Sequence, residues 1–264
     1  GCIERPARPR RAHRMTTEDP PPNARTTLPD ALQVFCRGGR ASIVAVTARA
    51  GPERFALTTA ILRTMSSPGV VVATSEGAGA YREFFAGNPT VPQAWTVLEG
   101  GNPEGGIRAV ARALARAREL VADPQREESL SALWLPAHIL EAFGLLPADR
   151  PGLVVIDSWD GLLSEYLPGG PAPTESWPSA EELESILIRT LRQYAQALVV
   201  VIVDASSRSR IGELADGVVE VVSRGQYGTL TGSMLILRRV GEGRERASLR
   251  FHLDGGIIRW QAGR

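Results

Sequence analysis

The sequence contains no lysine. All 30 of its Lys+Arg positions are arginine, a bias that GC-rich coding accounts for without selection at each site. The absence bears on nucleotide chemistry, because a phosphate loop of the form G-x-x-x-x-G-K-[ST] places a compact lysine ammonium against the β- and γ-phosphates. The planar arginine fork does not reproduce that point charge. The sequence therefore excludes a phosphate loop with the standard residues.

Features of metal sites and membrane spans are also scarce. The chain has 2 cysteines and 3 histidines, and their spacing fits no zinc site. The longest apolar runs, such as Leu198–Val203, are far shorter than the ~20 residues that a membrane span needs. The net charge of +1 creates no overall field toward nucleic acid or an anionic membrane. We therefore expect a cytoplasmic protein in a reducing compartment, with no membrane partner.

The N-terminal part differs in composition from the rest of the chain. Residues 1–28 are rich in proline and arginine and are predicted to be a disordered tail. Met15 follows a cluster of arginines, so residues 1–14 are a candidate for an untranslated segment. A short helix is expected over Leu28–Cys36, where two glycines then end it. Residues 29–264 are predicted to form one domain.

From residue 41 onward, apolar β-branched runs alternate with amphipathic segments. Continuous apolar runs are typical of strands that are buried on both faces of a parallel sheet. Strands are predicted at Ser42–Thr47, Val70–Thr74, Trp95–Leu98, Leu153–Ile156, Leu198–Val203, Gly217–Val222, Ser233–Leu237, Ala247–Leu253 and Ile257–Trp260. Helices are predicted at Arg54–Met65, Ile107–Val121, Leu130–Phe143 and Ala180–Ala195. This order predicts an α/β fold whose mainly parallel sheet is extended by antiparallel strands at the C-terminus.

Three landmarks occur in a definite order along the chain. They are a strand, turn and helix over Ile43–Leu62, the apolar strand LVVIDS at 153–158, and the C-terminal pair ELADGVVEV (213–221) and FHLDGGIIRW (251–260). Together they resemble the RecA superfamily, and most of all its KaiC/RadA-like branch. The resemblance covers about residues 28–260 and implies a RecA-like three-layer sandwich. It also implies a phosphate loop after the first strand.

The segment that corresponds to the phosphate loop departs from the family pattern. Gly51 is the one glycine kept in the loop, Pro52 removes a backbone donor, and Glu53 brings negative charge to the phosphate position. Arg54 or Glu53 stands where the lysine belongs, and Phe55 or Arg54 where the Mg-binding hydroxyl belongs. Gly51, Arg54 and Phe55 are therefore the candidate residues of a degenerate phosphate loop.

The resemblance carries three further roles to this chain. Asp157, at the end of LVVIDS, matches the Walker B aspartate that holds the magnesium ion, and Glu76 lies near the family's catalytic glutamate. Arg238 and Arg239 lie in the zone from which family members reach into a neighbour's nucleotide site. Each carboxylate also has a structural interpretation, since an Asp or Glu after a strand commonly stabilises the turn that follows.

Two arginine-bearing segments are candidates for nucleic-acid contact. The loop Asp204–Arg210 follows the fifth strand, where RecA-like recombinases keep a DNA-contacting loop, and it presents Arg208 and Arg210. A stripe of arginines on the predicted helix at 107–121 could also grip phosphates, but a solvated helix face with local acidic partners is the favoured interpretation.

These observations leave three functions open. The leading hypothesis is a non-catalytic RecA/KaiC-like protein, with no cofactor, that acts by assembly or regulation with itself or an active RecA-like paralogue. The second is a divergent ATPase that hydrolyses ATP with Mg²⁺ at a rebuilt site. The third is a DNA-repair accessory protein that binds single-stranded DNA. Because the fold resemblance supplies most of this argument, the site itself has to decide among them.

Overall fold

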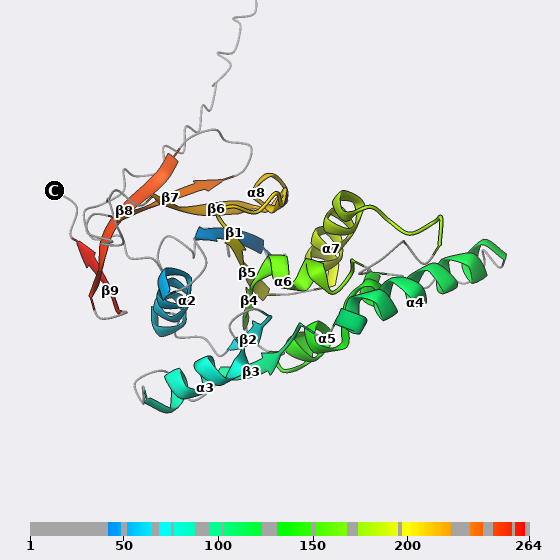
Figure 1. Ribbon diagram of the computed structural model, residues 1–264, viewed down its shortest axis with the longest axis horizontal. Helices are drawn as coiled ribbons and strands as arrows, with labels where there is room; N and C mark the ends of the chain where they lie inside the picture. The colour runs from blue at the N-terminus through cyan, green and yellow to red at the C-terminus, as the bar shows by residue number, and fades with distance from the viewer. Residues whose placement is uncertain are drawn as a thin grey trace, which may run out of the picture.

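The structure is a computed structural model with a nine-stranded sheet, whose parallel strands lie between two layers of helices (Figure 1). It describes residues 42–48, 52–64, 69–74, 77–87, 95–101, 103–122, 131–148, 152–167, 174–194, 197–222, 233–239, 245–254 and 257–261. For the last three strands the description concerns the backbone alone. The expected tail at 1–28 and the expected helix Leu28–Cys36 lie outside the described residues.

Six of the nine strands are parallel and run from one edge of the sheet in the order β3-β2-β4-β5-β1-β6. Their bounds are β1 Ser42–Ala48, β2 Gly69–Ala73, β3 Trp95–Glu99, β4 Gly152–Asp157, β5 Ala197–Asp204 and β6 Gly217–Val222. The α/β class and the parallel central sheet predicted from the sequence are confirmed. Beyond β6 the sheet continues through β7 (Ser233–Arg239), β8 (Glu245–Asp254) and β9 (Ile257–Gln261) in antiparallel pairing.

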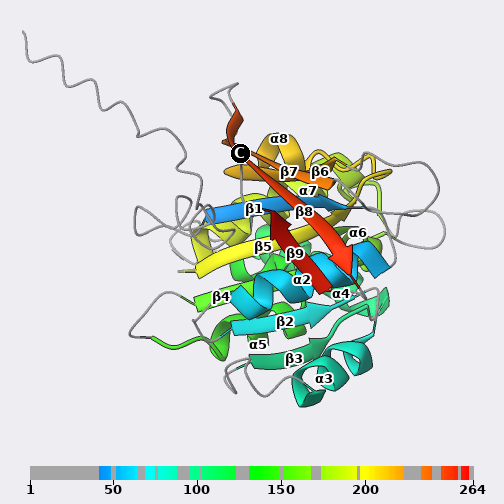
Figure 2. The ribbon, with the colours of Figure 1, turned by 90° about the vertical axis from the view of Figure 1, so that its left-hand side faces the viewer.

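Helices cover both faces of this sheet. On one face lie α2 (Pro52–Thr64) and α3 (Ala78–Gly87), and β9 lies beside α2 (Figure 2). On the other face lie α4 (Pro103–Ala122), α5 (Ala137–Gly144), α6 (Trp159–Ser164) and α7 (Ala180–Tyr194). The short helices η2 (Ser131–Trp134) and α8 (Ile211–Leu214) complete this layer.

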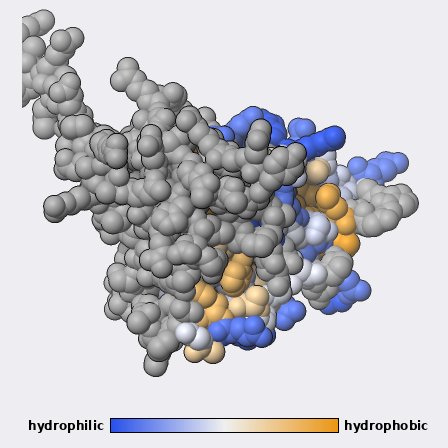
Figure 3. Space-filling view, turned by 60° about the vertical axis from the view of Figure 1, so that its left-hand side comes forward, coloured by the Kyte–Doolittle hydropathy of each residue, from blue (hydrophilic) through white to orange (hydrophobic). Residues whose placement is uncertain are grey.

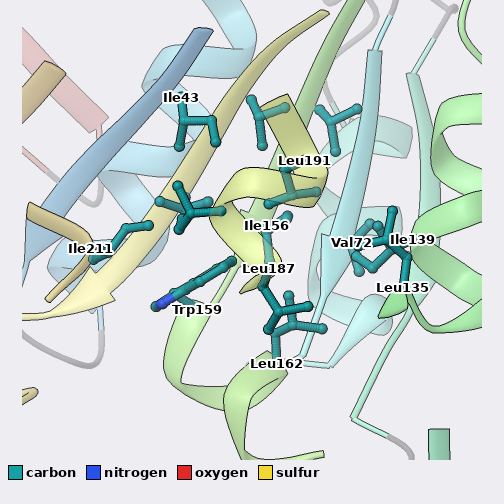
Figure 4. Close-up of a cluster of buried hydrophobic side chains, with 14 of the residues drawn as sticks. Ile43, Val72, Leu135, Ile139, Ile156, Trp159, Leu162, Leu187, Leu191 and Ile211 are labelled. Atoms are coloured by element: carbon teal, nitrogen blue, oxygen red, sulfur yellow. The ribbon is translucent and has the colours of Figure 1, made fainter. Parts of the chain in front are cut away.

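Alternate residues of each central strand point into two separate cores. In β1, Ile43 and Ala45 pack with α4–α8, whereas Val44 and Val46 pack with α2 and α3. The two-residue period of a strand produces this division. Figure 4 shows the larger core, where Trp159 and Leu187 lie among aliphatic side chains of the sheet and helices. Burial on both faces explains why these strands read as continuous apolar runs.

One helix prediction is wrong, and three helices were not predicted. The single helix expected over Leu130–Phe143 is divided into η2 and α5, because Pro136 lacks the N–H that would continue the helical ladder. Helices α3, α6 and α8 are missing from the sequence prediction. Helices α6 and α8 are only 6 and 4 residues long, and segments this short show little periodicity. Ser158 caps α6 by accepting a hydrogen bond from Gly161 N.

Candidate functional site

The candidate site lies at the edge where the parallel strands β1, β2, β4 and β5 end. In open α/β sheets, ligands bind in the crevice outside the carboxyl ends of the strands. Asp157 is the last residue of β4 and pairs in register with Ala73 at the end of β2. Helix α2, which begins after β1, brings Arg54 to the same place.

Arg54 and Asp157 form a buried ion pair. Arg54 Nε lies 3.1 Å from Asp157 Oδ1, and the two side chains are 7% and 0% exposed. In such surroundings neither charge is stabilised by water, so each depends on the other. The arginine expected at the lysine position therefore contacts the aspartate expected to hold magnesium.

Tyr81, from α3, engages the second oxygen of the same carboxylate. Its hydroxyl donates a hydrogen bond to Asp157 Oδ2, and the tyrosine is fully buried. Burial raises the pKa of Tyr81 far above its ordinary value, and the charge of Asp157 raises it further. The phenol is therefore neutral over the physiological pH range and acts as a fixed donor to Asp157.

The residues that follow Arg54 on α2 complete this cluster. The ring of Phe55 lies 5.0 Å from the ring of Tyr81, centroid to centroid, and 6.3 Å from that of Phe84. Phe55 therefore packs against other aromatic rings, and its side chain has no oxygen that could bind magnesium. Thr58 lies one turn later, where its hydroxyl donates to the carbonyl of Arg54 at 2.9 Å.

This arrangement does not fit a magnesium ion. Mg²⁺ prefers near-octahedral oxygen ligands and is held by carboxylates that can face it directly. Here one oxygen of Asp157 faces a guanidinium and the other a phenol. The described residues also contain no group of three or more metal-ligating side chains. The geometry instead fixes α2 and α3 to the end of β4.

Thr74 joins the ends of β2 and β4 beside this cluster. Its hydroxyl accepts from Ser158 N at 2.6 Å and donates to Ser158 O at 2.7 Å. The peptide bond between Asp157 and Ser158 is cis. A Cβ atom on Gly161 would lie 2.6 Å from Thr74 Oγ1, so α6 approaches this contact closely. The carboxyl end of β4 is therefore hydrogen-bonded to the end of β2, and α6 packs closely against the same contact.

The loop Asp204–Arg210 lies at the same edge and is held by two carboxylates. Asp160 of α6 accepts from Asp204 N at 2.9 Å and from the Ser207 hydroxyl. Glu184 of α7 accepts from Arg210 N at 2.9 Å, from Trp159 Nε1 at 2.8 Å and from the Ser209 hydroxyl. These bonds fix the backbone of the whole loop.

The two arginines of this loop differ in their surroundings. The Arg210 guanidinium donates two hydrogen bonds of 3.1 Å to Glu213 Oε2 and lies 3.9 Å from Glu181. Arg210 also borders a cleft of about 700 Å³ between α4, η2 and α7, which Trp134 and Trp177 line. Arg208 is exposed. Of the two predicted nucleic-acid residues, Arg208 is the one whose charge is not balanced by a carboxylate within the described part of the chain.

Of the other predicted residues, Gly51 and Glu76 lie outside the described residues. Arg238 and Arg239 are on β7, paired with Val218 and Gly217 at the start of β6. They therefore lie toward the amino ends of the parallel strands, whereas Asp157 lies at the carboxyl ends. The predicted trans-acting role of these arginines remains a prediction.

Sequence reasoning missed Tyr81. It lies 76 residues before Asp157 in a helix whose sequence, AGAYREFFAG, has the ordinary look of a packed aromatic surface. No local motif marks a tyrosine that donates to a carboxylate from another element. The arginine stripe on α4 matches its favoured interpretation, because Arg108 pairs with Glu104 and Arg116 with Glu119 on the helix surface.

Comparison with known proteins gives similarity in structure alone. No protein-family model and no curated protein matches the chain. Among solved structures, a KaiC-like protein from the hyperthermophilic archaeon Pyrococcus horikoshii OT3 superposes with a TM-score of 0.49 and 15% identity, over 84% of this chain and 90% of that one. The RadB recombinase gives a TM-score of 0.44 and 11% identity, over 86% and 95%. Identities this low say nothing of activity, so the properties of the site follow from its own residues.

The described surface offers little apolar area. None of the helices in the described ranges is long and apolar enough to cross a membrane. Leu145 and Leu167 are the large apolar side chains most exposed there, at 50% and 45%. On the face seen in Figure 3, hydrophobic areas are interrupted by hydrophilic side chains. Scattered exposure of this kind is normal for a protein surface.

Proposed function

We propose that this chain is a non-catalytic RecA/KaiC-like protein that works by assembly or regulation, with copies of itself or with an active RecA-like paralogue. One observation carries the proposal. The aspartate that would hold magnesium is buried, and its oxygens are engaged by Arg54 and Tyr81. A carboxylate whose two oxygens are engaged in this way holds helices to the sheet and is not available to bind a magnesium ion.

The surroundings of Asp157 support the same conclusion. Opening the site to Mg²⁺ would leave Arg54 as an unpaired charge in a nearly dry environment, which costs several kcal/mol, about 3–5 for a broken buried pair. The chain lacks a lysine that could bind the phosphates in place of Arg54. Assembly would use the surfaces of the sheet and helices, and Arg238 or Arg239 would act on the neighbouring subunit.

Nucleotide binding tests the proposal directly. We expect calorimetry of the full chain with ATP or ADP to give no binding heat at high micromolar nucleotide, with or without Mg²⁺. The same measurement on Arg54→Met distinguishes two explanations for an absence of binding. Nucleotide binding by the variant would mean that Arg54 blocks the site, and no binding would mean that the site is missing. Mg²⁺-dependent binding by the wild type, or ATP turnover that Asp157→Ala abolishes, would overturn the proposal.

The alternative of a divergent ATPase makes the opposite prediction. If Arg54 serves as the phosphate ligand, nucleotide affinity is present in the wild type and lost in Arg54→Ala and in EDTA. This alternative rests on the sequence resemblance, which assigns Arg54 to the lysine position and Asp157 to the magnesium-binding position. The same calorimetry therefore decides between the two functions.

Single-stranded DNA binding has one observation in its favour. The loop Asp204–Arg210 is fixed in place with Arg208 exposed at the carboxyl edge of the sheet. Binding through phosphates falls steeply as salt rises, with a slope set by the number of contacts. Fluorescence anisotropy with an oligonucleotide at low and moderate salt tests this function. Absence of binding at low salt would exclude it, and Arg208→Ala identifies the contact if binding occurs.

A further inference from the structure

Another buried carboxyl group lies apart from Asp157, on the face of β2 and β3 that α5 covers. Glu165 follows the last turn of α6, and its side chain is 1% exposed. Its Oε1 accepts a hydrogen bond of 2.6 Å from Gly101 N, in the loop between β3 and α4. Its Oε2 is buried and has no hydrogen-bond partner in the described part of the chain. A carboxyl group in this condition is costly unless it holds a proton or gains a charged partner.

His138 of α5 is the titratable side chain in contact with Glu165. Its Nε2 lies 3.5 Å from Glu165 Oε1, is buried and makes no hydrogen bond to the described residues. The histidine side chain is 13% exposed, so one part of the pair reaches the surface. The pair therefore places a base and an acid within 3.5 Å of each other.

Both side chains lie against the glycines of the β3–α4 loop. A Cβ atom on Gly100 would come 3.1 Å from His138 Nε2, and one on Gly105 would come 3.1 Å from Glu165 Oε2. Gly101 has a φ of 90°, which glycine adopts without strain. Two backbone bonds complete the contact, Gly100 N to Ala73 O at 3.0 Å and Ile107 N to Glu165 O at 3.1 Å.

The other charges near the pair do not balance an ionised Glu165. Burial raises the pKa of the adjacent Tyr166, and the charge of Arg112 on α4 partly offsets this effect. The Tyr166 hydroxyl donates a hydrogen bond to Trp134 O. Glu104 and Arg108, on the exposed start of α4, pair with each other. The start of α4 itself favours negative charge through its unpaired N–H groups. Even so, burial raises the pKa of Glu165 to about 7, against the Gly101 hydrogen bond that lowers it, and burial lowers the pKa of His138.

We propose that Glu165 and His138 form a proton-operated latch that holds the β3–α4 loop against α5 and α6. The latch is closed while the pair holds one proton and is therefore neutral. It loosens when that proton leaves, because an unbalanced negative charge then remains buried. Loosening releases the backbone N–H groups of Gly101 and Ile107 from Glu165 at the carboxyl edge of the sheet. The loop would thus respond to pH near neutrality, independently of the Asp157 cluster.

The direction of the response follows from the two states of Glu165. In the open loop the carboxyl group meets water and has an ordinary pKa, whereas in the closed loop it has the raised value. Glu165 alone would make closure most favourable below its ordinary pKa and would raise the opening constant by up to about tenfold per pH unit until the raised value is reached. His138 acts in the opposite direction, because burial lowers its pKa in the closed loop and its protonation therefore favours opening at low pH. The two effects oppose each other below the ordinary pKa of histidine, so the net loss of closure falls between that value and the raised pKa of Glu165, about 7.

Hydrogen exchange of the full chain between pH 5.5 and 8.5 tests the latch, after correction for the intrinsic exchange rate. We expect the amides of residues 100, 101 and 104–107 to open up to about threefold more readily as pH rises from about 6 to about 7, and to level off above it. Glu165→Gln keeps the shape and the hydrogen-bond acceptor but cannot ionise, so His138 alone remains to titrate and opening should become less frequent as pH rises from 5.5. Glu104→Gln, on the exposed first turn of the same helix, is the matched control and should follow the wild type. A flat wild-type profile between pH 6 and 8, or the wild-type profile in Glu165→Gln, overturns the proposal.

A carboxyl-carbon NMR titration of the wild type keeps the test decisive if the glutamine variant does not fold. Titration of Glu165 near neutrality supports the latch, and titration in the ordinary range of a glutamate refutes it. His138→Gln tests the partner, because losing the imidazole should move the Glu165 midpoint by at least about half a unit if the two share a proton. An unchanged midpoint would remove His138 from the latch.

Discussion

Arg54 Nε lies 3.1 Å from Asp157 Oδ1, with both side chains withdrawn from solvent. The contact links the helix that would open a phosphate loop to the aspartate that would hold its metal. Tyr81 approaches the other carboxylate oxygen from α3. Two helices of one layer, α2 and α3, therefore meet strand β4 at a single charge pair.

Removing Arg54 alone should destabilise the protein strongly. Arg54→Met leaves Asp157 charged, buried and without its cation, so we expect a loss of about 3–5 kcal/mol in the free energy of unfolding, measured in urea. The double variant Arg54→Met, Asp157→Asn removes both charges and keeps an oxygen that can accept from Tyr81. It should recover most of the loss. Equal destabilisation of the two variants would mean that packing of the arginine stem, and not its charge, matters.

The Tyr81 hydroxyl should contribute more than an ordinary buried hydroxyl. Its acceptor is an ionised carboxylate, so Tyr81→Phe should cost about 1.5–3 kcal/mol of unfolding free energy. Tyr166→Phe is the matched comparison, because that buried hydroxyl donates to the neutral carbonyl of Trp134 at 2.8 Å. We expect about 0.5–1.5 kcal/mol there. The reverse order in chemical denaturation would argue that Asp157 is not charged in the folded state.

Two helical glycines should respond in opposite ways to alanine. A Cβ atom at Gly106, in α4, would lie 2.7 Å from the backbone carbonyl of Glu165 and 2.8 Å from the Tyr166 ring, so Gly106→Ala should cost about 1–3 kcal/mol. At Gly79, in α3, no atom lies within 4 Å of the added Cβ. Gly79→Ala should therefore be neutral or stabilise by up to about 1 kcal/mol. Thermal melting of the pair measures both effects, and a loss at Gly79 would count against the described packing of α3.

The ordered loop after β5 should depend on Glu184. Glu184→Gln loses one of the acceptors that hold Trp159, Ser209 and Arg210, and we expect about 1–3 kcal/mol of destabilisation with faster hydrogen exchange at residues 205–210. Glu213→Gln is the control, because it affects an exposed pair with Arg210 and should change stability by less than about 0.5 kcal/mol. If exchange in the loop is unaffected by Glu184→Gln, other contacts hold it.

Secondary structure was largely accessible from the sequence where burial governs it. The run SIVAVTA forms β1, and its unbroken apolar character follows from packing on both faces. Helix ends were less accessible. Pro136 separates η2 from α5 within a segment whose apolar pattern suggested one helix, because pattern records which faces are buried and not where the ladder is interrupted.

The candidate site was accessible only in part. The sequence identified Asp157 by its place after an apolar strand and Arg54 by its place after β1, but not that the two would neutralise each other. It gave no signal for Tyr81, or for Glu165, whose bond to Gly101 spans 64 residues. Contacts over such separations depend on the order of the strands and on which helix covers which face.

The sequence by itself determined the alternation of buried strands with helices, and it excluded a lysine-based phosphate loop, because composition and hydrophobic period are local properties of the chain. Tertiary structure alone decided which charges meet. Burial removes the water that would otherwise stabilise the charge of Asp157, so the ionised carboxylate depends on the groups within hydrogen-bonding distance. Those groups, Arg54 and Tyr81, come from separate helices and meet Asp157 only when the sheet is assembled.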